Sequence, residues 1–279
     1  MLSGELATYL TGRYVEIKMT PFSFPEFLEA TDSSDKKSDL EQRFFRYLDF
    51  GGFPFLSHIG YDPEASKDYL EDLYGAILLK DVVRRKKIRD VDLLDRIVRY
   101  VMNETGHAFS ARSISDFFKS EKRIVAPETV LNYISACEEA FFFSRVKRQD
   151  LIGKRILAVD EKYYVTDLGL RRAIIGGRIA KDIDIALENA VYAELIRRGY
   201  DVTIGRVRNK EIDFVCDKDG ERSFIQVSYL LASDETKDRE YGAFDLIKSR
   251  GKRILLTMDH LDMSTDEIEH HYIPSWLIT

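Results

Sequence analysis

The stretch that decides the fold is ENAVYAELIRRGYDV (residues 188–202), which continues through KEIDFV (210–215) to ERSFIQVSY (221–229). Its first part has the apolar spacing of an amphipathic helix and ends at Gly199, a residue type that commonly stops helices. The two runs that follow are short, rich in β-branched and aromatic residues and separated by turn-forming residues, so they predict strands. A helix followed by paired strands predicts an α/β unit with a mixed sheet.

Acidic and amide side chains stand inside these apolar strands. Asp213 lies within EIDFV and Gln226 within FIQVS, where strands tend to exclude such residues. We therefore expect both side chains at one polar spot at a sheet edge, with Glu188 from the preceding helix as a further member. Each alone has a simpler explanation, since Glu188 suits a helix start and Asp213 can pair with a nearby basic residue.

In this order of helix, hairpin and strand the sequence resembles the PD-(D/E)xK nuclease superfamily, in which a helix Glu, a strand Asp and a following (E/Q)xK collect a divalent metal and activate a water. The resemblance implies Glu188, Asp213 and Gln226 as catalytic residues, with Glu188 and Asp213 as ligands of Mg²⁺. The lysine position holds Ser228, which cannot supply a cation. The resemblance thus implies a degenerate site.

A lysine from another element could replace the missing one, and Lys210 and Lys248 are the candidates by position. Two interpretations follow. The first, which we expect, is a non-catalytic module; the second is a Mg²⁺-dependent DNA nuclease with a relocated lysine. Mg²⁺ is a cofactor only if the nuclease-like site is competent.

Residues 105–180 predict two helices and a two-stranded hairpin, the order of a winged helix. The second helix begins at Pro127 and offers Asn132 and Tyr133 to a groove. The hairpin carries three cations that could contact the phosphates of DNA: Arg145, Lys147 and Arg148. Several glutamates on the second helix would repel a phosphate backbone, so DNA binding stays open beside a protein-docking role.

The N-terminal part divides into two segments. Residues 1–30 predict a helix, a strand and the start of a second helix, too little to fold alone, and residues 31–39 (TDSSDKKSD) predict a loop. Residues 40–104 have helical spacing throughout, with the turn GGFP at 51–54. The basic run at 84–89 (RRKKIR) is typical of a solvated helix end.

Taken whole, the chain resembles the C-terminal part of a large prokaryotic family of predicted AAA-type ATPases, whose ATPase module is followed by a winged helix and a nuclease-like domain. The resemblance is carried by LSGELATYLTGRYVEIKMTPFSFPEFL (2–28), GGFPFL (51–56), YYVTDLGLRRAIIG (163–176) and the helix and strand quoted first. It implies four parts: a remnant of the ATPase core (1–30), a helical lid-like segment (40–104), a winged helix (105–180) and a mixed-sheet restriction-endonuclease-like domain (181–279).

The resemblance also implies a nucleotide-sensing role for Gly51, Gly52 and Pro54, provided that a phosphate-binding half is supplied. The sequence has no GxxxxGK[ST] phosphate loop, so ATP hydrolysis by this chain alone is not expected. We expect a truncated or split gene product that binds ATP only with a missing N-terminal half. The simpler explanation of GGFP is an interhelical turn.

Composition sets the remaining limits. The 279 residues are 44% hydrophobic and 32% charged, which is globular composition, and the formal charge of -6 argues against a uniformly basic surface. Cys137 and Cys216 are the only cysteines and lie far apart, so a disulfide framework is excluded, and the five histidines have no metal or triad spacing. No apolar run is long enough to cross a bilayer, so we expect a cytoplasmic protein without a membrane partner.

These observations predict an α/β chain that is the non-catalytic regulatory and partner-binding part of an AAA-type ATPase. The expected partner is DNA, a protein, or the ATPase N-terminal half. The alternatives are the relocated-lysine nuclease and the completing half of a split ATPase.

Overall fold

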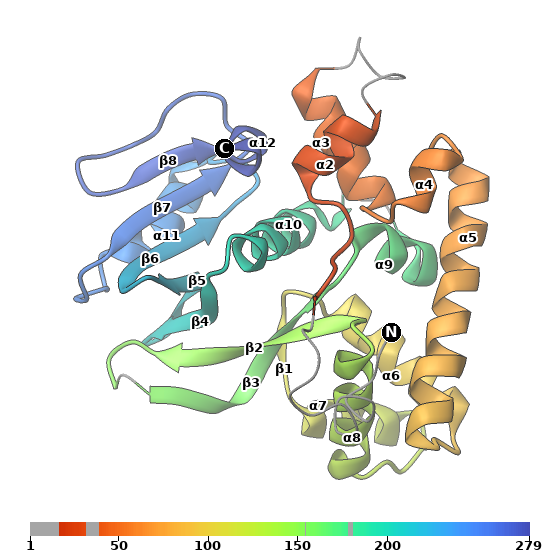
Figure 1. Ribbon diagram of the computed structural model, residues 1–279. Coiled ribbons are helices and arrows are strands. Elements are labelled where there is room, and N and C mark those ends of the chain that lie inside the picture. The colour runs from red at the N-terminus through yellow and green to blue at the C-terminus, as the bar shows by residue number, and fades with distance from the viewer. Residues whose placement is uncertain (1–16, 32–38, 154, 178–180) are drawn as a thin grey trace.

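The computed structural model describes residues 17–31, 39–153, 155–177 and 181–279 (Figure 1). The fold is mixed α/β, built on one eight-stranded sheet in the order β1-β3-β2-β4-β5-β6-β7-β8, and this confirms the fold class expected from the sequence. The helix expected at 2–10 and most of the strand expected at 13–19 lie outside the described residues. Residues 17–20 form neither helix nor strand.

Helices fill the N-terminal half and flank the sheet in the C-terminal half (Figure 1). They are α2 (Phe24–Thr31), α3 (Leu40–Phe50), α4 (Phe55–His58), α5 (Pro63–Ala76), the π-helix η1 (Ile77–Arg84), α6 (Val91–Asn103), α7 (Ala111–Ser120), α8 (Pro127–Glu139), α9 (Leu168–Ile175), α10 (Ile183–Arg197), α11 (Asp234–Phe244) and α12 (Ile273–Ile278).

The strands are β1 (Ala108–Phe109), β2 (Phe143–Asp150), β3 (Arg155–Val165), β4 (Asp201–Val207), β5 (Lys210–Lys218), β6 (Glu221–Val227), β7 (Lys252–Thr257) and β8 (Glu269–Tyr272). β4, β5 and β6 are antiparallel neighbours, and β6, β7 and β8 run parallel. The strands expected between 201 and 258 are therefore present. α11 begins after Ser233, which caps the helix by accepting the amide of Thr236.

The hairpin of β2 and β3 joins the C-terminal strands in a single sheet. Residues Arg148 to Asp150 of β2 pair in parallel with Ile204 to Arg206 of β4. α10 packs on one face, against buried side chains such as Phe214, and α11 packs on the other with Phe244. Segments that the sequence assigned to separate parts thus share one sheet, since β4 would otherwise leave its outer edge unpaired.

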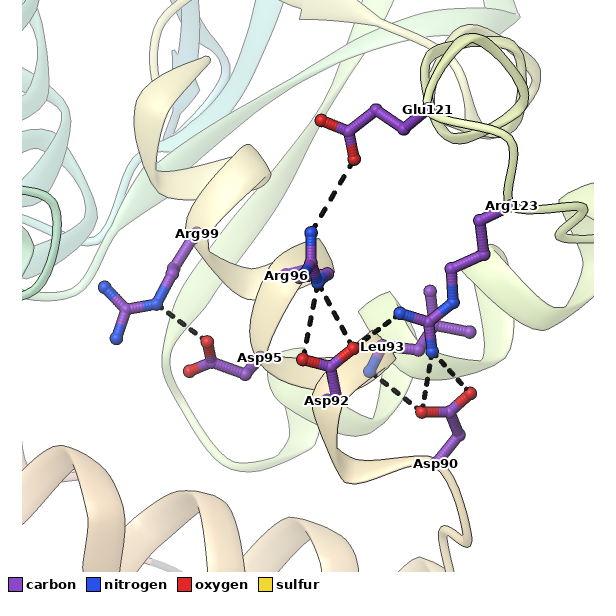
Figure 2. A network of polar contacts seen from close by, with 8 residues as sticks. All are labelled: Asp90, Asp92, Leu93, Asp95, Arg96, Arg99, Glu121 and Arg123. Carbon is purple, nitrogen blue, oxygen red and sulfur yellow. Dashed lines mark hydrogen bonds and ion pairs between the residues drawn. The ribbon is translucent and has the colours of Figure 1, made fainter.

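Ion pairs fix α6 to the loop between α7 and α8 (Figure 2). Arg123 donates to both carboxylate oxygens of Asp90 (2.9 and 2.7 Å) and also to Asp92 (2.5 Å). Asp90 accepts the amide of Leu93 as the N-cap of α6, and Arg96 reaches Glu121 at 3.7 Å. The hydrogen bonds of Arg123 lower the pKa of Asp92, and those of Leu93 and Arg123 lower that of Asp90. α6 therefore packs with the helices that follow it.

A close backbone crossing joins α9 to the end of α3. A Cβ added at Gly169 would stand 1.9 Å from the carbonyl oxygen of Phe50. The crossing therefore requires glycine at this position of the YYVTDLGL stretch.

We expect Gly169→Ala to lower the free energy of unfolding by more than about 2 kcal/mol, because two backbones must separate. Gly75→Ala is the matched control, since Gly75 lies in α5 with open space where its Cβ would stand. That control should gain roughly 0.5–1 kcal/mol of helix propensity. Denaturant unfolding measures both, and an unchanged stability for Gly169→Ala would contradict the crossing.

Candidate functional site

A β-bulge directs Asp213 towards α10. Thr203 faces Val215 and Gly205 faces Ile212, so the single residue Ile204 stands opposite both Asp213 and Phe214. The extra residue in β5 turns the Asp213 side chain to the α10 face, and such bulges often re-aim a side chain at a site.

Gln226 closes the bulge. Its Oε1 accepts the amide hydrogen of Asp213 (2.7 Å), and Asp213 Oδ2 accepts the amide hydrogen of Val227 (2.8 Å). Nε2 of Gln226 donates to Oε2 of Glu240 on α11 (2.9 Å). Both ends of the Gln226 amide are therefore bonded within the protein. The sequence motif is brought together as expected, and its amide also has a structural task, because an unpaired buried amide hydrogen is costly.

A lysine that the sequence analysis did not single out completes the site. Lys162 comes from β3, where a register irregularity between β2 and β3 lies just before it. Its Nζ lies 2.9 Å from Oε1 of Glu188 and 2.7 Å from Oε1 of Glu211. The side chain of Lys162 is only 5% exposed, so its charge depends on these two carboxylates.

Two further side chains of the hairpin strands reach the same carboxylates. Tyr164 OH donates to Oε1 of Glu188 (2.5 Å), and its ring stacks on Tyr192 of α10. Arg148 of β2 lies 3.2 Å from Oε2 of Glu211. We call Glu188, Glu211 and Asp213, together with the cation Lys162, the acidic cluster. Its anions come from α10 and β5, and its cation comes from the hairpin.

The electrostatics show why the cation is needed. Burial raises the pKa of Asp213 well above its usual range, and neighbouring Glu188 raises it further, while Lys162 opposes the shift. Burial lowers the pKa of Lys162, but the charges of Glu188, Asp213 and Glu211 outweigh burial and raise it. Lys162 therefore keeps its positive charge at neutral pH, and the pKa of the Asp213 carboxyl is raised.

The lysines proposed from position lie elsewhere. The Lys210 amine lies beside Gly242 of α11, Lys248 is exposed after that helix, and Ser228 is buried with its amide bonded to the carbonyl of Leu256 (3.0 Å). The lysine beside Glu188 is Lys162 of β3, which its position in the sequence does not indicate, because side-chain reach depends on strand pairing and β3 is distant in sequence. The only sequence signal was a lysine directly before the buried run YYV.

Within the part of the chain that the structure describes, no group of three His, Cys, Asp or Glu side chains has the arrangement of a metal site. Oε1 of Glu188 and Oε1 of Glu211 face the Lys162 ammonium, and Oε2 of Glu211 faces Arg148. The cluster is thus neutralised by the protein itself, and a divalent ion would have to displace an amine.

We expect Lys162→Gln to lower the free energy of unfolding by about 3–5 kcal/mol at neutral pH, because it leaves buried carboxylates without their cation. The loss should shrink as the pH falls, since protonation removes the carboxylate charges that Lys162 balances. Denaturant unfolding at two pH values measures the effect. Lys210→Gln is the control, and an equal loss in both variants would contradict the role assigned to Lys162.

The three cations proposed to contact DNA differ in their surroundings. Arg145 pairs with Glu138 and Glu161 (3.2 and 3.5 Å), and Arg148 is turned to Glu211, whereas Lys147 is exposed. Two of the three are therefore engaged by carboxylates of the chain.

The GGFP turn is tied to the end of β3 through a buried aspartate. Asp167 caps α9 through the amide of Leu170 (2.7 Å) and accepts the amide of Gly52 (2.7 Å), while Gly51 adopts a φ of 74° beside it. The carbonyl of Gly52 accepts the amide of Phe22 (2.7 Å), and Pro54 is exposed before α4. The two glycines thus serve a backbone junction, as the simpler explanation of GGFP requires.

An apolar cavity of about 290 Å³ lies next to this junction. Its walls include Phe22, Tyr47, Gly52, Asp167 and Tyr192. Tyr47 is buried and donates to the carbonyl of Phe22 (3.1 Å), so the polar groups here have protein partners.

Asp167 gives a pH-dependent prediction. Burial raises its pKa to about 6, against the lowering effect of its backbone hydrogen bonds. A folded-state pKa above the unfolded value means that the native protein binds the proton more tightly, so this group adds stability at acidic pH that is lost as the pH rises towards 7. We expect the wild type to gain roughly 1 kcal/mol relative to Asp167→Asn between pH 7 and pH 5. Denaturant unfolding of both proteins checks this, and a constant difference would contradict it.

Fold and site together define a mixed α/β protein in which a buried lysine of the hairpin is paired with two glutamates of the candidate site. The model of a domain of unknown function, DUF8612, matches residues 41–179. An uncharacterized protein of Haemophilus influenzae is 34% identical over 281 residues, which is 100% of this chain and 68% of that protein. The chain belongs to the same family as this protein.

An uncharacterized protein of Methanocaldococcus jannaschii is 27% identical over 256 residues, covering 88% of this chain and 56% of its own length. The chain thus spans about two thirds of one curated relative and little more than half of the other. No solved structure matches it significantly. Among the described residues, no helix is both long and apolar enough to span a membrane.

Proposed function

We propose that this chain is the non-catalytic C-terminal part of an AAA-type ATPase, in which a helical lid and a winged helix precede a degenerate nuclease-like unit that binds a partner. The observation that carries the proposal is the position of Lys162, whose amine lies 2.9 Å from Glu188 and 2.7 Å from Glu211. This ammonium takes Oε1 of Glu188, one of the carboxylate oxygens that a catalytic Mg²⁺ would use.

The rest of the site supports the same proposal. Gln226, the third residue of the motif, uses its carbonyl for the Asp213 amide and its amino group for Glu240, which leaves little to offer a metal. Burial and the charge of Glu188 raise the pKa of Asp213, which opposes metal binding because a carboxyl must lose its proton to bind a metal. Ser228 at the lysine position adds no cation.

The greater length of the relatives supports the ATPase part of the proposal. The chain covers 68% and 56% of its two relatives, so these relatives contain further sequence that can accommodate a phosphate-binding module. ATP would then be a ligand of the longer protein, sensed through Gly51, Gly52 and Pro54, and a split gene would supply that module as a separate chain. We also infer a cytoplasmic location, since Cys137 and Cys216 are both buried free thiols.

One observation favours a second candidate, a Mg²⁺-dependent DNA nuclease. Lys162 supplies an amine beside Glu188 and close to Asp213, as a relocated lysine would. If substrate and metal together displaced the ion pairs, Lys162 could stabilise charge at the scissile phosphate.

A cleavage assay decides between the two candidates. We expect the purified chain to leave both duplex and single-stranded DNA uncut in Mg²⁺ or Mn²⁺, with the same background as Asp213→Asn. The asparagine keeps an oxygen for the Val227 amide but cannot act as a charged ligand. Cleavage by the wild type that is lost in both Asp213→Asn and Lys162→Gln, but retained in Lys248→Gln, would overturn the proposal in favour of the nuclease.

A further inference from the structure

A band of exposed cations runs from the middle of η1 into the loop before α6. The sequence RRKKIR begins inside this helix and ends in the loop before α6, and Lys87 has a φ of 52°, which ends the helical path. The helix C-terminus accounts for cations up to Lys86 but not for those beyond it. We call the following exposed residues the basic band: Lys80, Arg84, Lys87 and Arg89.

Among the residues that the structure describes, the basic band has no counterion. The two other cations of the run are paired, Arg85 with Asp81 (3.4 Å) and Lys86 with Glu139 (2.6 Å). By contrast, no ion pair is found for the four side chains of the band within the described ranges of the chain.

The arginines at α6 and in the α7–α8 loop differ from the basic band because they are paired with carboxylates. In Figure 2, Arg96, Arg99 and Arg123 each face a carboxylate, with N to O distances of 3.2, 2.7 and 2.5 Å. The basic band is therefore a local surplus of positive charge on a chain whose formal charge is -6. Like charges placed together without counterions favour an anionic partner.

The position of the band next to α8 indicates which class of anionic partner binds there. The Lys86 to Glu139 pair holds the run against α8, the helix that the winged-helix proposal assigns to recognition. Asn132 of α8 is exposed, and Tyr133 is half-buried near Asp90 at the end of the run. Cations beside the exposed Asn132 amide suit a nucleic acid, whose phosphates need positive charge and whose base edges need hydrogen-bonding groups, provided that the phosphates follow the band and not the glutamates of α8.

A membrane surface fits these observations less well. Peripheral membrane binding combines cations with apolar side chains that enter the lipid. Among the described side chains of residues 80–89, none is an exposed large hydrophobic residue.

We propose that the basic band is a docking surface for nucleic acid, held through phosphate oxygens with α8 alongside. The proposal rests on the proposed function only in taking the α7, α8 and hairpin segment as a winged helix. It moves the phosphate contacts from Arg145 and Arg148, which the chain itself neutralises, to cations that the chain leaves unpaired.

Fluorescence anisotropy of a labelled DNA duplex, in EDTA to exclude metal-dependent cleavage, tests the proposal. The variant replaces all four band residues by glutamine, and circular dichroism confirms its fold. We expect its affinity to fall at least about tenfold at low salt, and the slope of log affinity against log salt to decrease by roughly 3 to 4, because each phosphate contact contributes about 0.9.

The matched control removes four exposed cations of the C-terminal unit: Arg206, Arg208, Lys248 and Arg250 to glutamine. It changes the net charge equally, and we expect its affinity to stay close to that of the wild type. Equal losses in both variants, or no loss in the band variant, would overturn the proposal. The proposal would also be overturned if the wild-type protein did not bind DNA but sedimented with vesicles containing anionic phospholipid. Binding without any cleavage leaves the non-catalytic function intact, so the two proposals fail separately.

Discussion

The buried charge of Lys162 is the interaction on which the arrangement of this protein depends. An ammonium that is 5% exposed must be balanced by carboxylates, and those within reach belong to α10 and β5. The hairpin is therefore held against the C-terminal strands by charge as well as by the pairing of β2 with β4. The β2–β3 hairpin and the C-terminal strands, which the sequence assigns to different parts, therefore meet at Lys162, and Lys162 belongs to the candidate site.

The site itself illustrates how one residue can serve both structure and chemistry. Asp213 is turned inward by a bulge, and the bulge persists because Gln226 accepts the amide hydrogen that the ladder leaves unpaired. A nuclease would use the same carboxylate for a metal. Here, the Lys162 amine bonds Oε1 of Glu188 and Oε1 of Glu211, and both ends of the Gln226 amide are bonded within the protein.

Charge is distributed differently on the N-terminal half. The arginines around α6 are paired with carboxylates, and these pairs hold the α7 to α8 loop in place. The basic run that precedes α6 has fewer partners, although it is only a few residues away. Paired cations here fix the fold, whereas unpaired cations remain available to a partner.

The sequence by itself determined the α/β class, the strand runs around Asp213 and Gln226 and the closeness of these two residues, because hydrophobic periodicity is local and strands that follow one another tend to pair. Only the tertiary structure decided that Lys162, and not Lys210 or Lys248, stands beside Glu188. Neither β8 nor α12 was anticipated, since a short strand depends on the edge of β7 rather than on its own residues. A contact between distant strands follows from register and bulges, which depend on the packing of the whole sheet.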